Sequence, residues 1–328
     1  MDIELLRERA DIIRKVRSFF DQRDFLETDT PLLAPNLIPE SCLEVFETFR
    51  LPPEGSQGSA KPYWLIPSPE IWMKPLIAKH RTSIYQICKC FRNGESSGRQ
   101  HSPEFTMLEY YAVDADYKYS LELTEDLFNF LLVDRLKNET GGASHELSPP
   151  FIRLTVEEAF KNWADFDLYR AASSNEAMEE EARRLGLNPP GGLSVHELYD
   201  LVFIHTVEPN LKMERPVALM DYPAFVPCLA KKSPDGKTVE RWELYIRGIE
   251  LANCFTEETN PEEVRRFFEN EKAEKQKSAL VRHAVNDDYW KNFISFPDCS
   301  GTAMGLDRLI MLLVERSTID GILPFPME

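Results

Sequence analysis

Two strand-forming segments on either side of a polar loop restrict the possible folds of this chain more than any other feature. Residues 83–91 and 104–113 are rich in aromatic and aliphatic side chains, while residues 93–101 between them are polar and contain glycine and serine. This pattern predicts two antiparallel strands joined by a long loop. A further extended segment is expected at residues 242–256. Because the expected helices come in blocks and do not alternate with strands, we predict an α+β fold in which helices flank an antiparallel sheet.

Apolar residues recur at helical spacing in several segments. The first of these predicts an amphipathic helix over residues 3–25. The other expected helices cover residues 120–137, 174–186, 261–283 and 307–315. The segments expected to be irregular are a loop at 52–62, a linker at 138–150 and a hairpin tip at 231–237 that contains an Asp-Gly pair. We expect a single domain over residues 1–328.

Composition limits the class of protein. Of the 328 residues, 43% are hydrophobic and 28% are charged, which suffices for a large core and excludes a disordered chain. No run of about 18 apolar residues is present, so no membrane span is predicted. The N-terminal residues lead directly into the first expected helix, without signal-peptide character. Six scattered cysteines without zinc-like spacing are interpreted as reduced thiols, and a cytoplasmic location is expected.

The charge balance bears on the choice of partner. The chain has 38 Lys and Arg residues against 55 Asp and Glu residues, a formal net charge of −17. Proteins that bind a nucleic-acid backbone usually present a basic surface, because their affinity comes largely from neutralising phosphates. Compact ligands and protein partners are therefore favoured, and no tRNA is expected as a partner.

The predicted hairpin carries the first group of candidate functional residues. Arg92 and Phe105 should project from one surface of its two strands. An arginine suits a phosphate, because its planar fork donates two parallel hydrogen bonds and stays charged. An aromatic ring beside it can stack on a purine. The alternative interpretation is an exposed hairpin with surface arginines.

The second group is a series of glutamates, Glu243, Glu250 and Glu257. Magnesium takes a few carboxylates and bridges phosphate oxygens, so two of these side chains could hold the metal of a nucleotide. A spacing of seven points successive members of a regular strand to opposite faces. Convergence therefore requires a bulge or turn near Gly248 or Asn253. Unrelated glutamates in an acidic protein are the alternative.

A third group lies near the end of the chain. Small residues at Gly301, Ala303 and Gly305 would let the backbone approach a ligand closely. Arg308, in the first turn of the helix that follows, can reach back towards a polyphosphate. The alternative is a capped helix N-terminus, with Arg308 paired to Asp307 or Glu315.

The order of these groups resembles motifs 1, 2 and 3 of the class II aminoacyl-tRNA synthetases. The residues within the motifs resemble those of the lysyl subgroup. The segments that carry the resemblance are Leu26–Pro31, Ser68–Glu70, His101–Glu109, Gly248–Asn253 and Gly301–Arg308. Lysyl-tRNA synthetases carry an N-terminal OB-fold that reads the anticodon. We expect none here, because the segment that resembles motif 1 starts within the first 30 residues. The resemblance therefore implies a class II synthetase catalytic domain without an anticodon-binding domain.

Several roles follow from this resemblance, with ATP and Mg²⁺ as cofactors. Arg92 and Arg308 would be catalytic, stabilising charge on the α-phosphate and clamping the nucleotide. The implied ATP-binding residues are Arg92, Asn93, Glu95, Arg99, His101, Ser102, Phe105, Glu250, Leu251, Asn253, Gly305 and Arg308. The implied residues for the amino acid are Ser68, Pro69, Glu70, Tyr111, Asn253 and Glu257. The implied metal ligands are Glu243 and Glu250.

The resemblance also implies the reaction. The stand-alone paralogues of lysyl-tRNA synthetase activate (R)-β-lysine or lysine as an adenylate and transfer it to a lysine side chain of elongation factor P. A homodimer is implied as well, because motif 1 forms the dimer interface in class II enzymes. Two alternatives stay open. The same adenylation could serve tRNA or another small acceptor, or the chain could be a non-catalytic regulatory paralogue.

The chain departs from the family pattern at four positions. Motif 2 usually reads Arg-Asn-Glu, whereas here Gly94 separates Asn93 from Glu95, so the adenine contact assigned to Glu95 is in question. Ser102 stands where the family has asparagine. Cys254 and Ala303 each stand where the family has glycine, and both add bulk near the expected amino-acid pocket.

Overall fold

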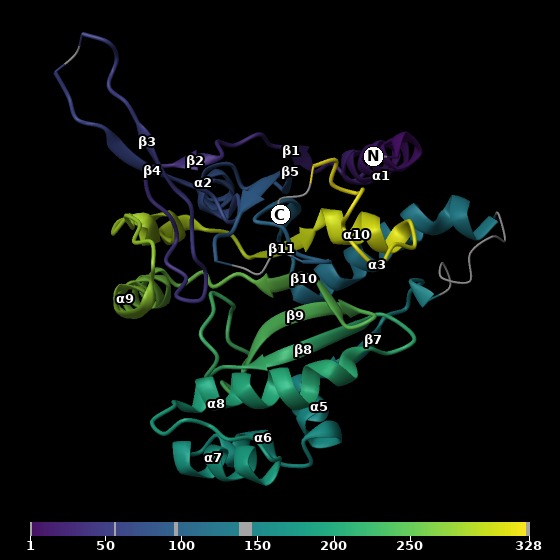
Figure 1. Ribbon diagram of the computed structural model, residues 1–328, viewed down its shortest axis with the longest axis vertical. Helices are drawn as coiled ribbons and strands as arrows, with labels where there is room; N and C mark the ends of the chain where they lie inside the picture. The colour runs from purple at the N-terminus through teal and green to yellow at the C-terminus, as the bar shows by residue number, and fades with distance from the viewer. Residues whose placement is uncertain (1, 56, 95–97, 138–145, 326–328) are drawn as a thin grey trace. The chain divides into compact units, whose positions relative to one another are not determined.

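The computed structural model describes residues 2–55, 57–94, 98–137 and 146–325. The chain divides into two compact units. Unit 1 comprises Met1–Ala115 and Glu257–Glu328, and unit 2 comprises Asp116–Thr256. Figure 1 shows both units, with labels on most of their helices and strands. Unit 2 is one continuous stretch of chain, whereas unit 1 is assembled from the two ends of the sequence.

Unit 1 is built on four strands in the order β1-β5-β6-β11. Their bounds are Leu26–Glu27 for β1, Ile84–Phe91 for β5, Glu104–Val113 for β6 and Cys299–Gly305 for β11. Strands β5, β6 and β11 pair antiparallel, and the short β1 pairs in parallel with β5. The predicted antiparallel hairpin is therefore confirmed, and both of its strands lie within one residue of the expected bounds.

A second sheet and five helical segments complete unit 1 (Figure 1). The small antiparallel sheet has the order β2-β4-β3, with bounds Leu33–Ala34, Lys61–Leu65 and Glu47–Arg50. The helical segments are α1 (Ile3–Asp21), α2 (Glu70–His80), α9 (Pro261–Ser278), η3 (Tyr289–Ser295) and α10 (Leu306–Leu313). The expected helix at residues 261–283 ends early, because Ala279 takes an extended backbone conformation.

Helix α1 covers one face of the main sheet of unit 1. The ring of Phe20 stacks on Tyr85 of β5, with 4.8 Å between centroids, and lies 5.0 Å from the ring of Tyr110 of β6. Because side chains alternate between the faces of a strand, the neighbours of Tyr110 in β6 point to the opposite face. Helix α1 ends at Asp21 rather than at the expected residue 25. Asp24 has a φ of 58°, which a right-handed helix cannot include.

Unit 2 contains four strands in the order β10-β9-β8-β7. Their bounds are Ile249–Thr256 for β10, Thr238–Ile246 for β9, Val217–Pro223 for β8 and Ile152–Thr155 for β7. Pairs β10–β9 and β9–β8 are antiparallel, whereas β7 and β8 are parallel. The helical segments are α3 (Tyr117–Lys137), α5 (Val156–Trp163), α6 (Leu168–Ala171), α7 (Asn175–Arg184), α8 (Val195–Val202), η1 (Phe203–Val207) and η2 (Glu208–Leu211). Of the expected linker, residues 138–145 lie outside the described residues.

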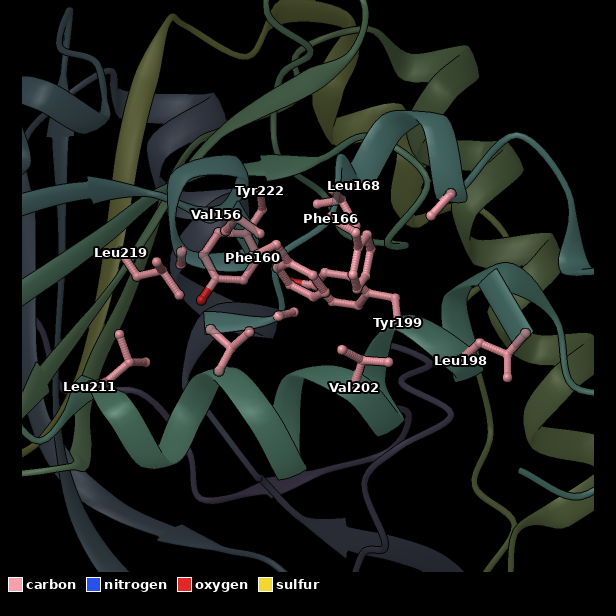
Figure 2. Packing of buried hydrophobic residues seen from close by; sticks show 14 of the residues in the cluster. Val156, Phe160, Phe166, Leu168, Leu198, Tyr199, Val202, Leu211, Leu219 and Tyr222 are labelled. Atoms are coloured by element: carbon pink, nitrogen blue, oxygen red, sulfur yellow. The ribbon is translucent and has the colours of Figure 1, made fainter. Parts of the chain in front are cut away.

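The helical half of unit 2 packs around an aromatic cluster (Figure 2). Phe160 of α5 stacks on Tyr199 of α8 with 5.1 Å between ring centroids, and Leu219 of β8 belongs to the same cluster. Capping boxes begin both α5, at Thr155, and α8, at Ser194. Sequence patterns predicted only α7 in this region, since α5 and α8 are just eight residues long.

The segment expected to be extended over residues 242–256 is a hairpin rather than one strand. Strand β9 ends at Ile246 and β10 begins at Ile249, and the two residues between them, Arg247 and Gly248, have φ values of 54° and 78°. Two consecutive positive φ values define the tight turn that best matches the twist of paired strands. In the described parts of the chain, no helix combines the length and apolar character needed to cross a membrane.

The aromatic cluster generates the first prediction. Phe160 is fully buried, so Phe160→Ala should leave a cavity and lower the free energy of unfolding by about 3–5 kcal/mol. Urea denaturation followed by circular dichroism measures the change. Ile204→Ala is the control, because the side chain of Ile204 is 53% exposed and its truncation should change stability by no more than about 0.5 kcal/mol. Equal effects of the two substitutions would contradict this account of the core.

Candidate active site

The β5–β6 hairpin brings Arg92 and Phe105 together. Phe105 pairs with Cys90, and the amide of Arg92 donates a hydrogen bond to the carbonyl of Pro103 at 3.0 Å. The guanidinium carbon of Arg92 lies 5.3 Å from the centroid of the Phe105 ring. A guanidinium group and an aromatic ring therefore lie side by side, as the sequence predicted.

The face of β6 opposite α1 is lined with large side chains, and the adjacent strand β11 has small ones there. On this face β6 presents Phe105, Met107, Glu109 and Tyr111. The cross-strand partners of the last three are Gly305, Ala303 and Gly301, respectively. Cross-strand partners share a face, so the small residues of β11 leave space beside the large residues of β6.

Gly301 is required for that space. A Cβ atom at this position would lie 2.5 Å from Oε1 of Glu257 and against the ring of Tyr111. No heavy atom can occupy that position without displacing one of them. The glycine therefore leaves room for the Tyr111 ring and the Glu257 carboxylate to pack against β11.

A buried group of polar side chains surrounds Glu109. Its carboxylate accepts hydrogen bonds from the hydroxyl of Ser68, at 2.6 Å, and from the hydroxyl of Tyr111, at 2.7 Å. The same Ser68 hydroxyl accepts a hydrogen bond from the amide of Glu70 at the start of α2, directly after Pro69. Two residues predicted for amino-acid binding, Ser68 and Tyr111, therefore converge on one carboxylate, and a third, Glu70, is connected to it through Ser68.

Glu257, another residue of unit 1 that was predicted for amino-acid binding, joins this group through Lys74. The ammonium of Lys74 forms ion pairs with Glu70 and with Glu257, the latter at 2.7 Å. The side chains of Lys74 and Glu257 are 0% and 1% exposed. The amide of Glu257 donates to the carbonyl of Cys299, which fixes the start of this segment beside β11.

Burial controls the ionisation of these carboxyls. Burial and the charge of Glu70 raise the pKa of Glu109 to about 8, although hydrogen bonds from Ser68 and Tyr111 oppose the shift. Burial also raises the pKa of Glu257 to about 7, against the opposing charge of Lys74. The pocket therefore binds protons at neutral pH, and a cationic ligand would favour their release.

The turn into α10 places Arg308 against the polar loop of residues 93–101, which lies in the segment that resembles motif 2 and is called the motif 2 loop below. Its Nε donates a hydrogen bond to the carbonyl of Gln100 at 3.1 Å. Asp307 accepts a hydrogen bond from the amide of Thr106 at 2.6 Å and forms a 2.9 Å ion pair with Arg9 of α1. Asp307 therefore links α10 to β6 and α1.

The motif 2 loop itself is partly described. Arg99 and His101 are exposed, whereas Ser102 is buried. The carbonyl of Arg99 accepts a hydrogen bond from the amide of Ile319, which fixes the loop to the C-terminal segment. Glu95 lies outside the described residues.

Asn93, also predicted to bind ATP, has a structural contact. Its amide donates to the carbonyl of Glu44 at 2.9 Å, and its side-chain nitrogen donates to the carbonyl of Val45 at 3.3 Å. Asn93 therefore holds the segment before β3 against the start of the motif 2 loop.

The remaining predicted residues lie on the β9–β10 hairpin of unit 2. Asn253 pairs with Glu243, and Glu250 pairs with Tyr245. A register shift between Glu250 and Ala252, at Leu251, interrupts the alternation of side chains. The turn and this bulge together place Glu243, Glu250 and Asn253 on one face, so the irregularity that the seven-residue spacing required is confirmed.

Glu243 belongs to a buried hydrogen-bond network. Its carboxylate accepts hydrogen bonds from the hydroxyls of Tyr222 and Tyr245, at 2.5 and 2.7 Å, and from the guanidinium of Arg241. Arg241 also donates to the side-chain oxygen of Asn253 at 3.1 Å. Glu250 is exposed. The two carboxylates supply oxygen donors on one face, which fits a Mg²⁺ ion that completes its shell with phosphate and water.

Three residues of these networks were missed by sequence analysis. Lys74 follows Glu70 by four residues, a spacing that usually marks an exposed helical pair. Glu109 stands two residues before Tyr111, so alternation along a strand was the available signal. Arg241 had no sequence signal beyond its charge. In the described ranges, no group of three or more His, Cys, Asp or Glu side chains forms a metal site.

Comparison with known proteins shows the family of this chain. The family model of the class II tRNA synthetases (D, K and N) matches residues 3–328. Three similar proteins are elongation factor P–(R)-β-lysine ligases. That of Vibrio atlanticus is 34% identical over 99% of this chain and 96% of its own length. That of Vibrio vulnificus is 35% identical, with the same coverage, and that of Proteus mirabilis is 33% identical over 98% of this chain and 94% of its own.

The raised pKa of Glu109 generates a prediction for stability. A carboxyl that binds its proton more tightly when folded stabilises the protein at low pH, and this contribution is lost as pH rises towards about 8. Between pH 6 and 8 the wild type should therefore lose about 1–2 kcal/mol more stability than Glu109→Gln. Urea denaturation at both pH values measures the difference. Glu122→Gln, which changes an exposed carboxylate, should keep the wild-type pH dependence.

Proposed function

We infer the activity from the family, because this chain belongs to the class II tRNA synthetases of the D, K and N group. We propose that the protein activates (R)-β-lysine or lysine with ATP, as an aminoacyl-adenylate, and transfers the acyl group to a lysine side chain of elongation factor P. We further propose that both units act as one catalytic domain over residues 1–328, in the cytoplasm.

The observation that carries this proposal is the buried acidic cluster in unit 1. Glu70, Glu109 and Glu257 are linked through Ser68 and Lys74, and Gly301 lies beside Glu257. Buried carboxylates are stable when cations pair with them. An amino acid with two ammonium groups supplies such cations, whereas an amino acid with an apolar side chain would leave buried charge unpaired. The site therefore fits a lysine-type substrate.

The nucleotide would bind at the other end of the same strand face. Phe105 would stack on adenine, and Arg92 beside it would hold the α-phosphate. As the amino-acid carboxylate attacks the α-phosphorus, negative charge increases on the non-bridging oxygens, and the fixed positive charge of Arg92 would stabilise it. Arg308, held against the carbonyl of Gln100, would clamp the departing pyrophosphate.

Magnesium, when bound, neutralises phosphate charge and keeps the triphosphate in one conformation. Glu243 and Glu250 are the residues of this chain that would hold it. The network of Tyr222, Tyr245 and Arg241 orients Glu243, and Glu250 is accessible to a bound nucleotide. No side chain needs to act as a nucleophile in the activation step, because the substrate carboxylate is itself the nucleophile.

Charge also supports a protein acceptor. A net charge of −17 disfavours the approach of tRNA, whose backbone carries the same sign. Transfer of the acyl group then requires attack by a neutral amine of the acceptor lysine on the carbonyl carbon of the adenylate, with AMP as the leaving group.

The reaction generates the third prediction. The protein should catalyse ATP–pyrophosphate exchange that depends on (R)-β-lysine or lysine, and should add one lysyl group to elongation factor P, as measured by intact-protein mass. Arg308→Ala should lower the exchange rate by about 10²–10³-fold, because a fixed charge on the nucleotide is lost. The control is Arg316→Ala, an exposed arginine just beyond α10, which should change the rate by less than about twofold. Exchange without transfer to elongation factor P would exclude the proposed acceptor.

We also propose a homodimer formed through the motif 1 segment. Leu26 and Leu33, on the short strands β1 and β2, are 58% and 45% exposed, and such apolar exposure is typical of an interface.

Sedimentation equilibrium should therefore give about twice the 37.9 kDa mass of one chain. Leu26→Glu should shift the protein to the monomer, because it places a charge in the interface. Ile294→Glu should not, although Ile294 is even more exposed, at 68%. A wild-type monomer at micromolar concentration would refute the proposed dimer.

A further inference from the structure

Lys74 is a cation inside the pocket that the proposed function assigns to a cationic substrate. It lies one helical turn after Glu70 in α2, and its side chain is fully buried. Its ammonium bridges Glu70 and Glu257, two residues predicted to bind the amino acid. An ammonium removed from water is stable only with such partners.

The charges around Lys74 do not balance. Its surroundings include the titratable side chains Glu40, Glu70, Glu109, Tyr111, Glu257 and Tyr289. The hydroxyls of Tyr111 and Tyr289 stay neutral, because burial raises the pKa of both well above its usual value. Glu40, in the segment before β3, is acted on by the charge of Glu70 but also by two other cations, Arg92 and Lys275, that favour its ionised form. The pocket itself therefore holds three carboxyls against a single ammonium.

Glu257 uses only one of its oxygens for Lys74. Oε2 forms the ion pair at 2.7 Å. Oε1 is buried and accepts no hydrogen bond from any described residue. It is the atom that lies against the position where a Cβ on Gly301 would be. Lys74 therefore holds one oxygen, and the other lies beside Gly301 of β11.

We propose that Lys74 is a positioning residue that sets the charge and the orientation of the amino-acid pocket. Its ammonium orients Glu70 and Glu257 and turns Oε1 of Glu257 towards Gly301. With all three carboxyls ionised, the pocket keeps two uncompensated negative charges, which match the two ammonium groups of a diamino acid. This inference rests on the proposed function and adds a reason for its substrate class.

Kinetics of the exchange reaction test the proposal. Lys74→Met and Lys74→Gln remove the charge and keep much of the volume. Each should raise the KM for the amino acid at least tenfold and leave the KM for ATP within about twofold of the wild-type value. Lys272→Met is the matched control, because Lys272 pairs with Asp287 and is 38% exposed outside this pocket. It should leave both constants unchanged.

The pH profile separates positioning from a structural role. Without the ammonium, Glu257 should ionise only at higher pH, because the attraction that favours its charged form is lost. The pH at which the KM for the amino acid reaches its minimum should therefore rise by about one unit or more in the two neutral variants. Lys74→Arg should restore the wild-type profile. An unchanged profile and an unchanged KM in the neutral variants would overturn the proposal.

A structure of the wild-type protein with the diamino acid bound gives an answer that does not depend on how the variants fold. Lys74 should stay within 4 Å of both carboxylates, with one substrate ammonium on Oε1 of Glu257. A substrate ammonium that takes the place of Lys74 would refute the positioning role. A different result would refute the proposed function itself: a wild-type protein that shows no ATP–pyrophosphate exchange dependent on an amino acid.

Discussion

The cost of burying carboxylates governs the amino-acid pocket. Glu109 and Glu257 are almost completely removed from water, and burial raises the pKa of each towards or above neutrality. One buried ammonium, on Lys74, offsets part of that cost. The negative charge that Lys74 does not neutralise can be neutralised by the positive charge of a substrate. The specificity proposed here is therefore a property of the unliganded protein, because the fold already contains the imbalance that the ligand corrects.

In unit 2, two irregularities of the β9–β10 hairpin determine which side chains share a face. Glu243 and Glu250 are separated by an odd number of residues, which a continuous strand would place on opposite faces. The turn at Arg247 and Gly248 reverses the chain, and the bulge at Leu251 returns Asn253 to the face of Glu243. These two local features create a shared face from a sequence spacing that would otherwise prevent it.

Sequence analysis succeeded where the signal was local. The hairpin with Arg92 and Phe105 was predicted, because strand propensity and alternation fix both positions. The need for an irregularity between Glu243 and Glu250 was also predictable from spacing. The helices of residues 156–211 were mostly missed, because they are short and depend on tertiary packing around Phe160. The role of Lys74 was not accessible either, since only the folded chain brings Glu257 to it and turns an ordinary helical pair into a buried one.

The contact between Arg9 and Asp307 has a consequence for biosynthesis. Arg9 is made at the beginning of translation, but its partner leaves the ribosome near the end, and the same holds for the pairing of β6 with β11. Unit 2 lies in one continuous stretch and has all of its strands available earlier. Because compact units generally fold as wholes, unit 2 can mature on the ribosome while α1 and the β5–β6 hairpin wait for the last part of the nascent polypeptide. Chaperones should therefore be needed mainly by the N-terminal segment, which is synthesised first.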